Sequence, residues 1–181
     1  MEFSDRIPLN AEVPIPVIHK WVKVWKDNEP TYRMMDESVS NMLNANKGKS
    51  ELELMTCVNR WVNMNIRYQF DPGDNWQAPS ETANLESGDC EDIAMLKLDL
   101  LDWLGIKTDR MDVWFVHVRQ SPQDHAILVI DDHIVLDSRS DSVHQLKELL
   151  PYYEPLSCIG RRGYKGLATP VIPGGQDVPS V

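Results

Sequence analysis

One change of hydrophobic period, at Gly105, constrains the fold of this chain more than any other feature. Before it, apolar residues recur at steps of three and four, and the last such stripe consists of Cys90, Ile93, Ala94, Leu98, Leu101 and Leu104. After it, β-branched and aromatic residues follow a period of two over residues 112–118, 126–130 and 133–136. Helices followed by adjacent strands predict an α+β fold, in which N-terminal helices pack on an antiparallel sheet.

The chain divides into three predicted parts. Residues 1–50 have early prolines and two amphipathic stretches, which indicates an arm followed by helices. Residues 51–165 carry the strongest periodic patterns and predict one domain, large enough to bury a hydrophobic core. Residues 166–181 contain three prolines and the pair Gly174-Gly175, which favours a flexible tail.

Local signals place the remaining elements. Helices are predicted over residues 17–26, 36–46, 51–66 and 142–150, with one or two strands between 156 and 165. Residues 67–88 are rich in Pro, Gly, Asn, Asp and Ser, which predicts a long loop that leads to Cys90. Because long loops inside compact domains often carry function, we expect this loop to be functional.

Composition and charge exclude several classes of partner. The net charge of -10 and the pI of about 4.9 argue against a nucleic acid or an anionic membrane, since phosphate binding needs clustered Lys and Arg. Three cysteines without a CxxC argue against a disulfide framework and for a reducing compartment. The first residues lack a basic segment followed by an apolar run, so a cytoplasmic location is expected.

Cys90 differs from the other two cysteines in its surroundings. It follows Gly88 and is flanked by three acids at the start of a predicted helix. A thiol there faces unpaired backbone N–H groups and the positive end of the helix dipole, which favour the thiolate that attacks a carbonyl carbon. Cys57 and Cys158 lie in apolar patterns and are expected to be structural. Cys90 is therefore the candidate nucleophile.

His125 and Asp137 complete a candidate Cys-His-Asp triad, because one lies at the start of a predicted strand and the other ends the next strand. Strand side chains alternate, so the two point to the same face only if the loop between the strands has an odd number of residues. A three-residue loop at 130–132 would place them directly opposite each other, whereas a two-residue loop would require a β-bulge. Asp141 is the reserve acid and His117 the reserve histidine.

Four segments together resemble the bacterial transglutaminase-like cysteine proteases, over roughly residues 58–165. They are Asn75-Trp76-Gln77-Ala78-Pro79, Gly88-Asp89-Cys90-Glu91-Asp92-Ile93-Ala94, His125-Ala126-Ile127-Leu128 and Val135-Leu136-Asp137. The resemblance implies a papain-like or transglutaminase-like fold with the nucleophile at a helix N-terminus. It also implies that Cys90 is the nucleophile, His125 the general base and then acid, and Asp137 the residue that orients the imidazole.

The three acids around Cys90 raise an electrostatic question, because carboxylates beside a thiol disfavour its ionisation. One interpretation is that they cap the helix and are neutralised by its N–H groups. The other is Ca²⁺, which binds oxygen ligands and would favour a thiolate. Members of the resembled family that release surface adhesins use calcium through acids flanking the nucleophile. The resemblance thus implies Asp89 and Glu91 as ligands, with Asp92 as a third.

Trp76 lies in the loop before the helix and is interpreted as a wall of the substrate pocket. Its indole N–H is an alternative oxyanion donor to the backbone N–H of Cys90. Three functions stay open at this point. The first is a cysteine endopeptidase that acts on a protein or peptide through a thioester acyl-enzyme. The second is an acyl transferase or amidase of the same fold, and the third is a non-enzymatic scaffold or virion-associated protein. The chemistry itself requires no cofactor, and the oligomeric state is not indicated.

Overall fold

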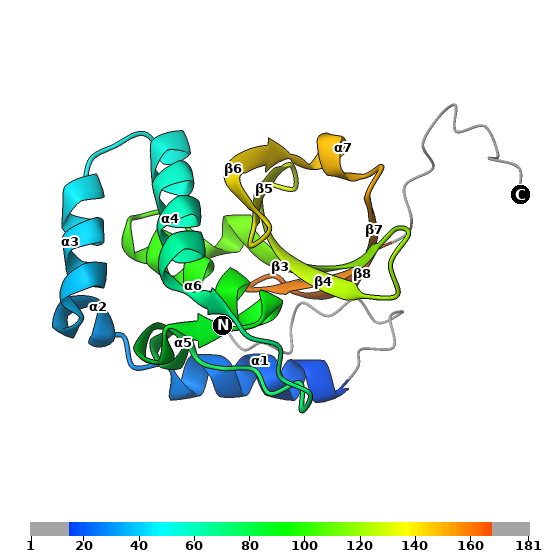
Figure 1. The fold of residues 1–181 in the computed structure, drawn as a ribbon, viewed down its shortest axis with the longest axis horizontal. Coiled ribbons are helices and arrows are strands. Elements are labelled where there is room, and N and C mark those ends of the chain that lie inside the picture. Colours follow the sequence, from blue (N-terminus) through cyan, green and yellow to red (C-terminus); the bar gives the residue numbers. More distant parts are fainter. Residues whose placement is uncertain (1–14, 168–181) are drawn as a thin grey trace, which may run out of the picture.

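A computed structural model describes residues 15–167 as a helical half joined to a curved sheet (Figure 1). The helices that precede Gly105 lie together on one side, and the strands of the sheet curl away from them on the other. The predicted arm and tail fall almost entirely on residues 1–14 and 168–181, which lie outside the described residues.

The helical half is formed by segments that precede Gly105. They are α1 Ile15–Asp27, α2 Tyr32–Met35, α3 Glu37–Asn46, α4 Glu51–Asn65, α5 Pro79–Leu85 and α6 Cys90–Trp103. Helix α4 begins with a capping box, in which the Ser50 N–H donates to Glu53 at 3.0 Å. The predicted helices over 17–26, 36–46 and 51–66 are confirmed by α1, α3 and α4.

The sheet has the strand order β6-β5-β4-β3-β7-β8, with every neighbouring pair antiparallel. Its strands are β3 Met111–Val118, β4 Asp124–Ile130, β5 Ile134–Asp137, β6 Ser140–Gln145, β7 Tyr153–Gly160 and β8 Gly163–Gly166. Strands β3 to β6 form a meander, and β7 returns to pair with β3. The predicted α+β fold with an antiparallel sheet is confirmed.

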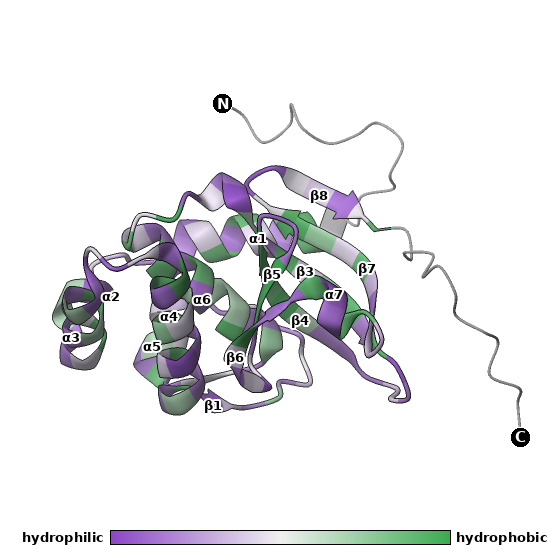
Figure 2. Ribbon diagram, turned by 90° about the horizontal axis from the view of Figure 1, so that it is seen from above, coloured by the Kyte–Doolittle hydropathy of each residue, from purple (hydrophilic) through white to green (hydrophobic). Residues whose placement is uncertain are grey.

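Alternation along the strands gives the sheet two apolar faces. On β4, Leu128 and Ile130 join the main core with helices α4 and α6, whereas Ile127 and Val129 join a second cluster on the other face. The short helix α7, Leu146–Leu149, packs its leucines against that second cluster. Figure 2 shows hydrophobic residues along the central strands and hydrophilic ones along β6. The α6 side chains are mostly buried, so this helix is fixed against the sheet.

The predicted helix over residues 142–150 is correct only in its second half. Its first part is strand β6, which pairs with β5 through Ile134↔Gln145 and Val135↔His144, and only one turn of helix, α7, follows. Val143 packs against the main core, while its neighbours in β6 are more exposed. Pairing with β5 therefore outweighs the weak local helix signal.

The predicted long loop at residues 67–88 is only partly correct. It contains strand β1 Arg67–Tyr68, helix α5, and strand β2 Ser87–Gly88, which pairs in parallel with β1. Pro79 at the first helical position is a helix-start signal. Within residues 15–167, no helix combines the length and the apolar character that a membrane crossing requires.

Candidate active site

Cys90 is the first residue of α6, as predicted. Asp89 is the N-cap residue, and its backbone N–H donates to the Asp92 carboxylate at 3.2 Å, which closes a capping box. Gly88 is required just before this turn, because a Cβ there would lie 2.7 Å from the Cβ of Asp92. The local sequence thus fixes the start of the helix and the place of the thiol.

His125 and Asp137 form a buried pair. The His125 Nε2 atom lies 2.7 Å from Asp137 Oδ1, and their side chains are 1% and 2% exposed. Asp137 also accepts the Arg139 N–H at 2.9 Å and the Tyr153 hydroxyl at 2.6 Å. Burial alone would raise the pKa of Asp137, but the hydrogen bonds and the charge of His125 lower it to about 2. This carboxylate therefore stays ionised and can orient the imidazole.

The register of the β4–β5 hairpin explains why the two side chains meet. Ile130 pairs with Ile134, so the loop is the three residues 131–133, and Asp131 and Asp132 adopt positive φ angles of 52° and 61°. An odd loop keeps His125 and Asp137 on one face, which confirms that prediction. The two residues are not directly opposite each other, because the loop lies at 131–133, one residue later than 130–132, and the pairing of the two strands shifts with it.

The Cys90 thiol lies against the start of β4. It donates to Glu91 Oε2 at 3.3 Å, and the Ala126 backbone N–H donates to the sulfur. Burial, followed by the charges of Glu91 and Asp89, raises the pKa of Cys90 to about 12. Burial and these negative charges thus outweigh the effect of the helix N-terminus on the thiol pKa. They favour the protonated thiol at neutral pH. The thiol donates its hydrogen bond to Glu91 and not to His125. The predicted contact between Cys90 and His125 therefore stays a prediction.

Three buried acids surround the thiol. Asp89, Glu91 and Asp92 are each less than 9% exposed. Burial, reinforced by neighbouring carboxylates, raises the pKa of Glu91 to about 8 and that of Asp92 to about 7, and burial also raises the pKa of Asp89. Asp71 and Asp74, in the preceding loop, add further negative charge beside Asp89. Acids in this state favour any cation that replaces their protons.

The acids differ in how well they suit a cation. Asp92 caps backbone donors, the N–H groups of Gln77 at 2.8 Å and of Asp89. Asp89 Oδ1 is buried without a hydrogen-bond partner among the described residues. The oxygen donors and the charge fit calcium. In residues 15–167, however, no group of three or more His, Cys, Asp or Glu side chains is arranged to hold a metal.

Trp76 is a buried residue, 7% exposed, whose ring stacks on Phe115 with a centroid distance of 5.6 Å. Its indole N–H donates to Asp74 Oδ1 at 3.2 Å. Phe115 on β3 pairs with Ala126 on β4, so Trp76 packs on the strand next to the one that contacts the thiol. Its predicted role as a pocket wall stays a prediction.

The reserve residues lie elsewhere. His117 is partly exposed and bonds Asp124 at 2.9 Å, and Asp141 accepts only a long 3.3 Å hydrogen bond from Asn63. Cys158 is buried, as expected, whereas Cys57 is partly exposed. Sequence reasoning missed Tyr153, because the strand was predicted to begin at 156; the start of β7 at Tyr153 places its hydroxyl on Asp137.

Comparison with known families decides the identity. The family described as bacterial transglutaminase-like cysteine proteinase BTLCP matches residues 17–153, most of the chain. The chain belongs to this family. It is therefore a cysteine protease with a transglutaminase-like domain, which confirms the resemblance inferred from the four segments. No curated protein matches the chain.

Solved structures of this transglutaminase-like type agree with the fold. LapG from Legionella pneumophila is 21% identical, with a TM-score of 0.66, and the match covers 82% of this chain and 87% of LapG. The calcium-bound form of the same protein is 20% identical, with a TM-score of 0.65, covering 86% of this chain and 92% of LapG. The predicted transglutaminase-like fold is confirmed.

Proposed function

We propose that this cysteine proteinase is an endopeptidase in which Cys90 attacks the peptide carbonyl carbon, with His125 as base and acid and Asp137 as the orienting group. The observation that carries the proposal is the buried pair of His125 and Asp137 at 2.7 Å, one residue from the Ala126 N–H that bonds the thiol. A thiol at a helix start beside such a pair is the arrangement that acyl-enzyme chemistry needs.

In the proposed mechanism each imidazole nitrogen has its own role. Nε2 is bonded to Asp137, so Nδ1 is the nitrogen available to take the proton of Cys90. The sulfur then attacks the carbonyl carbon, and the backbone N–H of Cys90 donates to the developing oxyanion. When the C–N bond breaks, the protonated imidazole gives its proton to the leaving amine and a thioester forms. Water, deprotonated by the same nitrogen, hydrolyses the thioester and releases the acid and the thiol.

We also propose that Asp89 and Glu91 bind Ca²⁺, with Asp92 as a further ligand. Burial first, and then the charges of Glu91 and Asp89, raise the pKa of the thiol, and Glu91 accepts its hydrogen bond. A bound calcium ion would supply positive charge at this place, which favours the thiolate. That LapG, of the same fold, has been solved with calcium bound supports the proposal.

The endopeptidase proposal is tested on denatured casein in the presence of Ca²⁺. Cys90→Ala should abolish cleavage, because the nucleophile is lost, while Cys158→Ala, at a buried cysteine of the second apolar cluster, should cleave casein like the parent. Cleavage that survives Cys90→Ala contradicts the proposal. Adding a primary amine separates hydrolysis from acyl transfer: incorporation of the amine at the new C-terminus in preference to water would favour the acyl transferase alternative.

Calcium binding is tested by alkylation with limiting iodoacetamide and peptide mapping. With chelator, Cys90 should react slowly, since the pKa of its thiol is about 12. Calcium should accelerate alkylation of Cys90 by about tenfold or more, because a lower pKa increases the thiolate fraction. Asp89→Ala should remove the acceleration. The buried Cys158 is an internal control whose rate should not respond to calcium, and an unchanged Cys90 rate would leave helix capping as the role of the acids.

A further inference from the structure

A pocket of about 330 Å³ is lined by Tyr68, Phe70, Gln123, Ser138 and Arg139, which are near neighbours in the chain or the sheet of the proposed triad. Ser138 and Arg139 directly follow Asp137, and Gln123 lies two residues before His125. Tyr68 pairs with Gly88, two residues before Cys90. Every member of the triad thus has a lining residue as a near neighbour. The pocket therefore lies where the side chains of a peptide bound at the triad can reach it.

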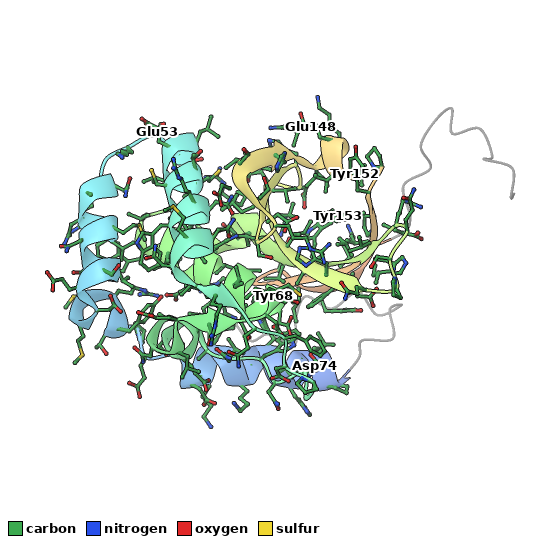
Figure 3. All side chains as sticks on the ribbon, viewed as in Figure 1. Glu53, Tyr68, Asp74, Glu148, Tyr152 and Tyr153 are labelled. Carbon is green, nitrogen blue, oxygen red and sulfur yellow. The ribbon has the colours of Figure 1, made fainter. Side chains whose placement is uncertain are left out.

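Two aromatic side chains of the pocket face solvent. Tyr68 is 55% exposed and Phe70 is 71% exposed. Figure 3 shows Tyr68 where the helical half and the sheet meet, with Tyr153 inside the curve of the sheet. Exposed aromatic residues beside a reactive centre supply apolar contact area to a ligand at low conformational cost. They suit the backbone and the aliphatic part of a substrate side chain.

The polar groups of the pocket are hydrogen-bond donors. Arg139 is exposed. Its side chain is hydrogen-bonded to Tyr153 and takes part in none of the ion pairs found among residues 15–167. The Ser138 hydroxyl is buried without a hydrogen-bond partner among residues 15–167. Burial, followed by the charges of Cys90, Asp89 and Glu91, raises the pKa of the Tyr68 phenol. The positive charge of Arg139, which lines the same pocket, lowers it.

We propose that this pocket is a substrate subsite that binds an acidic side chain of the peptide, close to the bond that Cys90 attacks. Arg139 supplies the charge and a planar fork of donors that matches a carboxylate. The Ser138 hydroxyl supplies a further donor that lacks a protein acceptor. Tyr68 and Phe70 hold the aliphatic part of the side chain. This proposal rests on the proposed endopeptidase function. It specifies the substrate class as peptides with an acidic side chain close to the cleaved bond.

The test measures binding instead of cleavage, so that it does not depend on whether Cys90 performs the chemistry. Immobilised Cys90→Ala protein is equilibrated in Ca²⁺ with a random peptide library, and the retained peptides are sequenced. We expect them to be enriched in Asp and Glu. A retained peptide remade with Gln in place of its Glu should bind about fivefold more weakly, because a charge-assisted hydrogen bond is lost.

Arg139→Glu, made in the Cys90→Ala protein, should lose the acidic enrichment. Arg161→Glu is the matched control, because it makes the same charge change where Arg161 bonds Thr108, at the opposite end of β3 from the pocket. Equal acidic enrichment in the two variants contradicts the proposed subsite. The proposal is also contradicted if the Cys90→Ala protein retains no peptides, or retains peptides that are not enriched in Asp and Glu. The retained peptides are then offered to the protein with Cys90 intact. If none is cleaved, the endopeptidase proposal fails while the subsite stands.

Discussion

The carboxylate of Asp137 is held at both oxygens. His125 and the Arg139 N–H lie at Oδ1, and the Tyr153 hydroxyl donates to Oδ2 at 2.6 Å. The Tyr153 ring also lies against the imidazole, with centroids 5.8 Å apart. We interpret Tyr153 as a positioning residue, because it touches the acid and the base of the proposed triad but not the thiol.

Tyr153→Phe should lower kcat/KM for casein by about tenfold, since it removes one hydrogen bond to a buried charged group. The chain offers a matched control in Tyr152→Phe, because the neighbouring tyrosine is 65% exposed. Both variants should keep the far-ultraviolet circular dichroism spectrum of the parent. Equal kcat/KM for the two variants would contradict a positioning role for Tyr153.

At the scale of elements, helices α4 and α6 hold the turn between β5 and β6. The Asn63 side chain donates to the carbonyl oxygens of Asp137 at 3.0 Å and Ser140 at 2.9 Å. Asn59 donates to the Ser140 carbonyl at 2.8 Å and accepts from the fully buried Lys97 ammonium at 2.8 Å. The strand end that carries the triad acid is therefore anchored from the helical half.

Lys97 makes the stability of this anchor depend on pH. Burial lowers the pKa of Lys97 to about 7, against 10.5 for an ordinary lysine. Between these two values the unfolded chain binds a proton that the folded protein lacks, so the free energy of unfolding rises with pH. The expected slope is on the order of 1 kcal/mol per pH unit. Urea denaturation at pH 7 and pH 9.5 measures it.

Lys97→Met should reduce the rise in stability between these two pH values. The exposed Lys107 is the control, and Lys107→Met should keep the slope of the parent. A slope that is the same in all three proteins would show that Lys97 stays charged when the protein is folded. The hydrogen bond to Asn59 and the charges of Asp137 and Asp141 would then stabilise the buried ammonium.

At the scale of the whole molecule, the negative charge is concentrated where the chemistry is proposed. The net charge is -10, and the acids from the loop and the start of α6 meet beside Cys90. The fold keeps Glu91 and Asp92 partly protonated near neutral pH, with pKa values of about 8 and about 7. Stability should therefore respond to protons and to calcium at the same place.

Without calcium, the melting temperature should fall as pH rises from 5 to 7. Over this range the folded protein holds protons that the unfolded chain has released, since the folded pKa values are raised, and deprotonation favours unfolding. Calcium should raise the melting temperature more at pH 7 than at pH 5, because it replaces the protons. The double variant Asp89→Asn, Glu91→Gln should lose most of both effects. A melting temperature independent of pH in chelator would contradict the raised pKa values.

The helix starts and the strand faces of this protein follow from patterns within short pieces of the chain. Period and capping residues set α3, α4 and α6, since helix hydrogen bonds join residues four apart. The position of Cys90 at the start of α6 follows from these signals. Strand alternation and an odd loop length set the common face of His125 and Asp137, because both are counts along a short piece of chain.

Other features depend on segments that are distant in the chain and meet in the fold. Strand β6 replaces the first half of the helix predicted over residues 142–150, because β5 offers it a partner. Tyr153 reaches Asp137 across the curve of the sheet, and Asn63 reaches it from α4. The protonated thiol is a tertiary effect as well, because its raised pKa comes first from burial, which no local pattern encodes. Sequence patterns specify backbone hydrogen bonds between near neighbours, whereas the charge state of a buried group depends on everything packed around it.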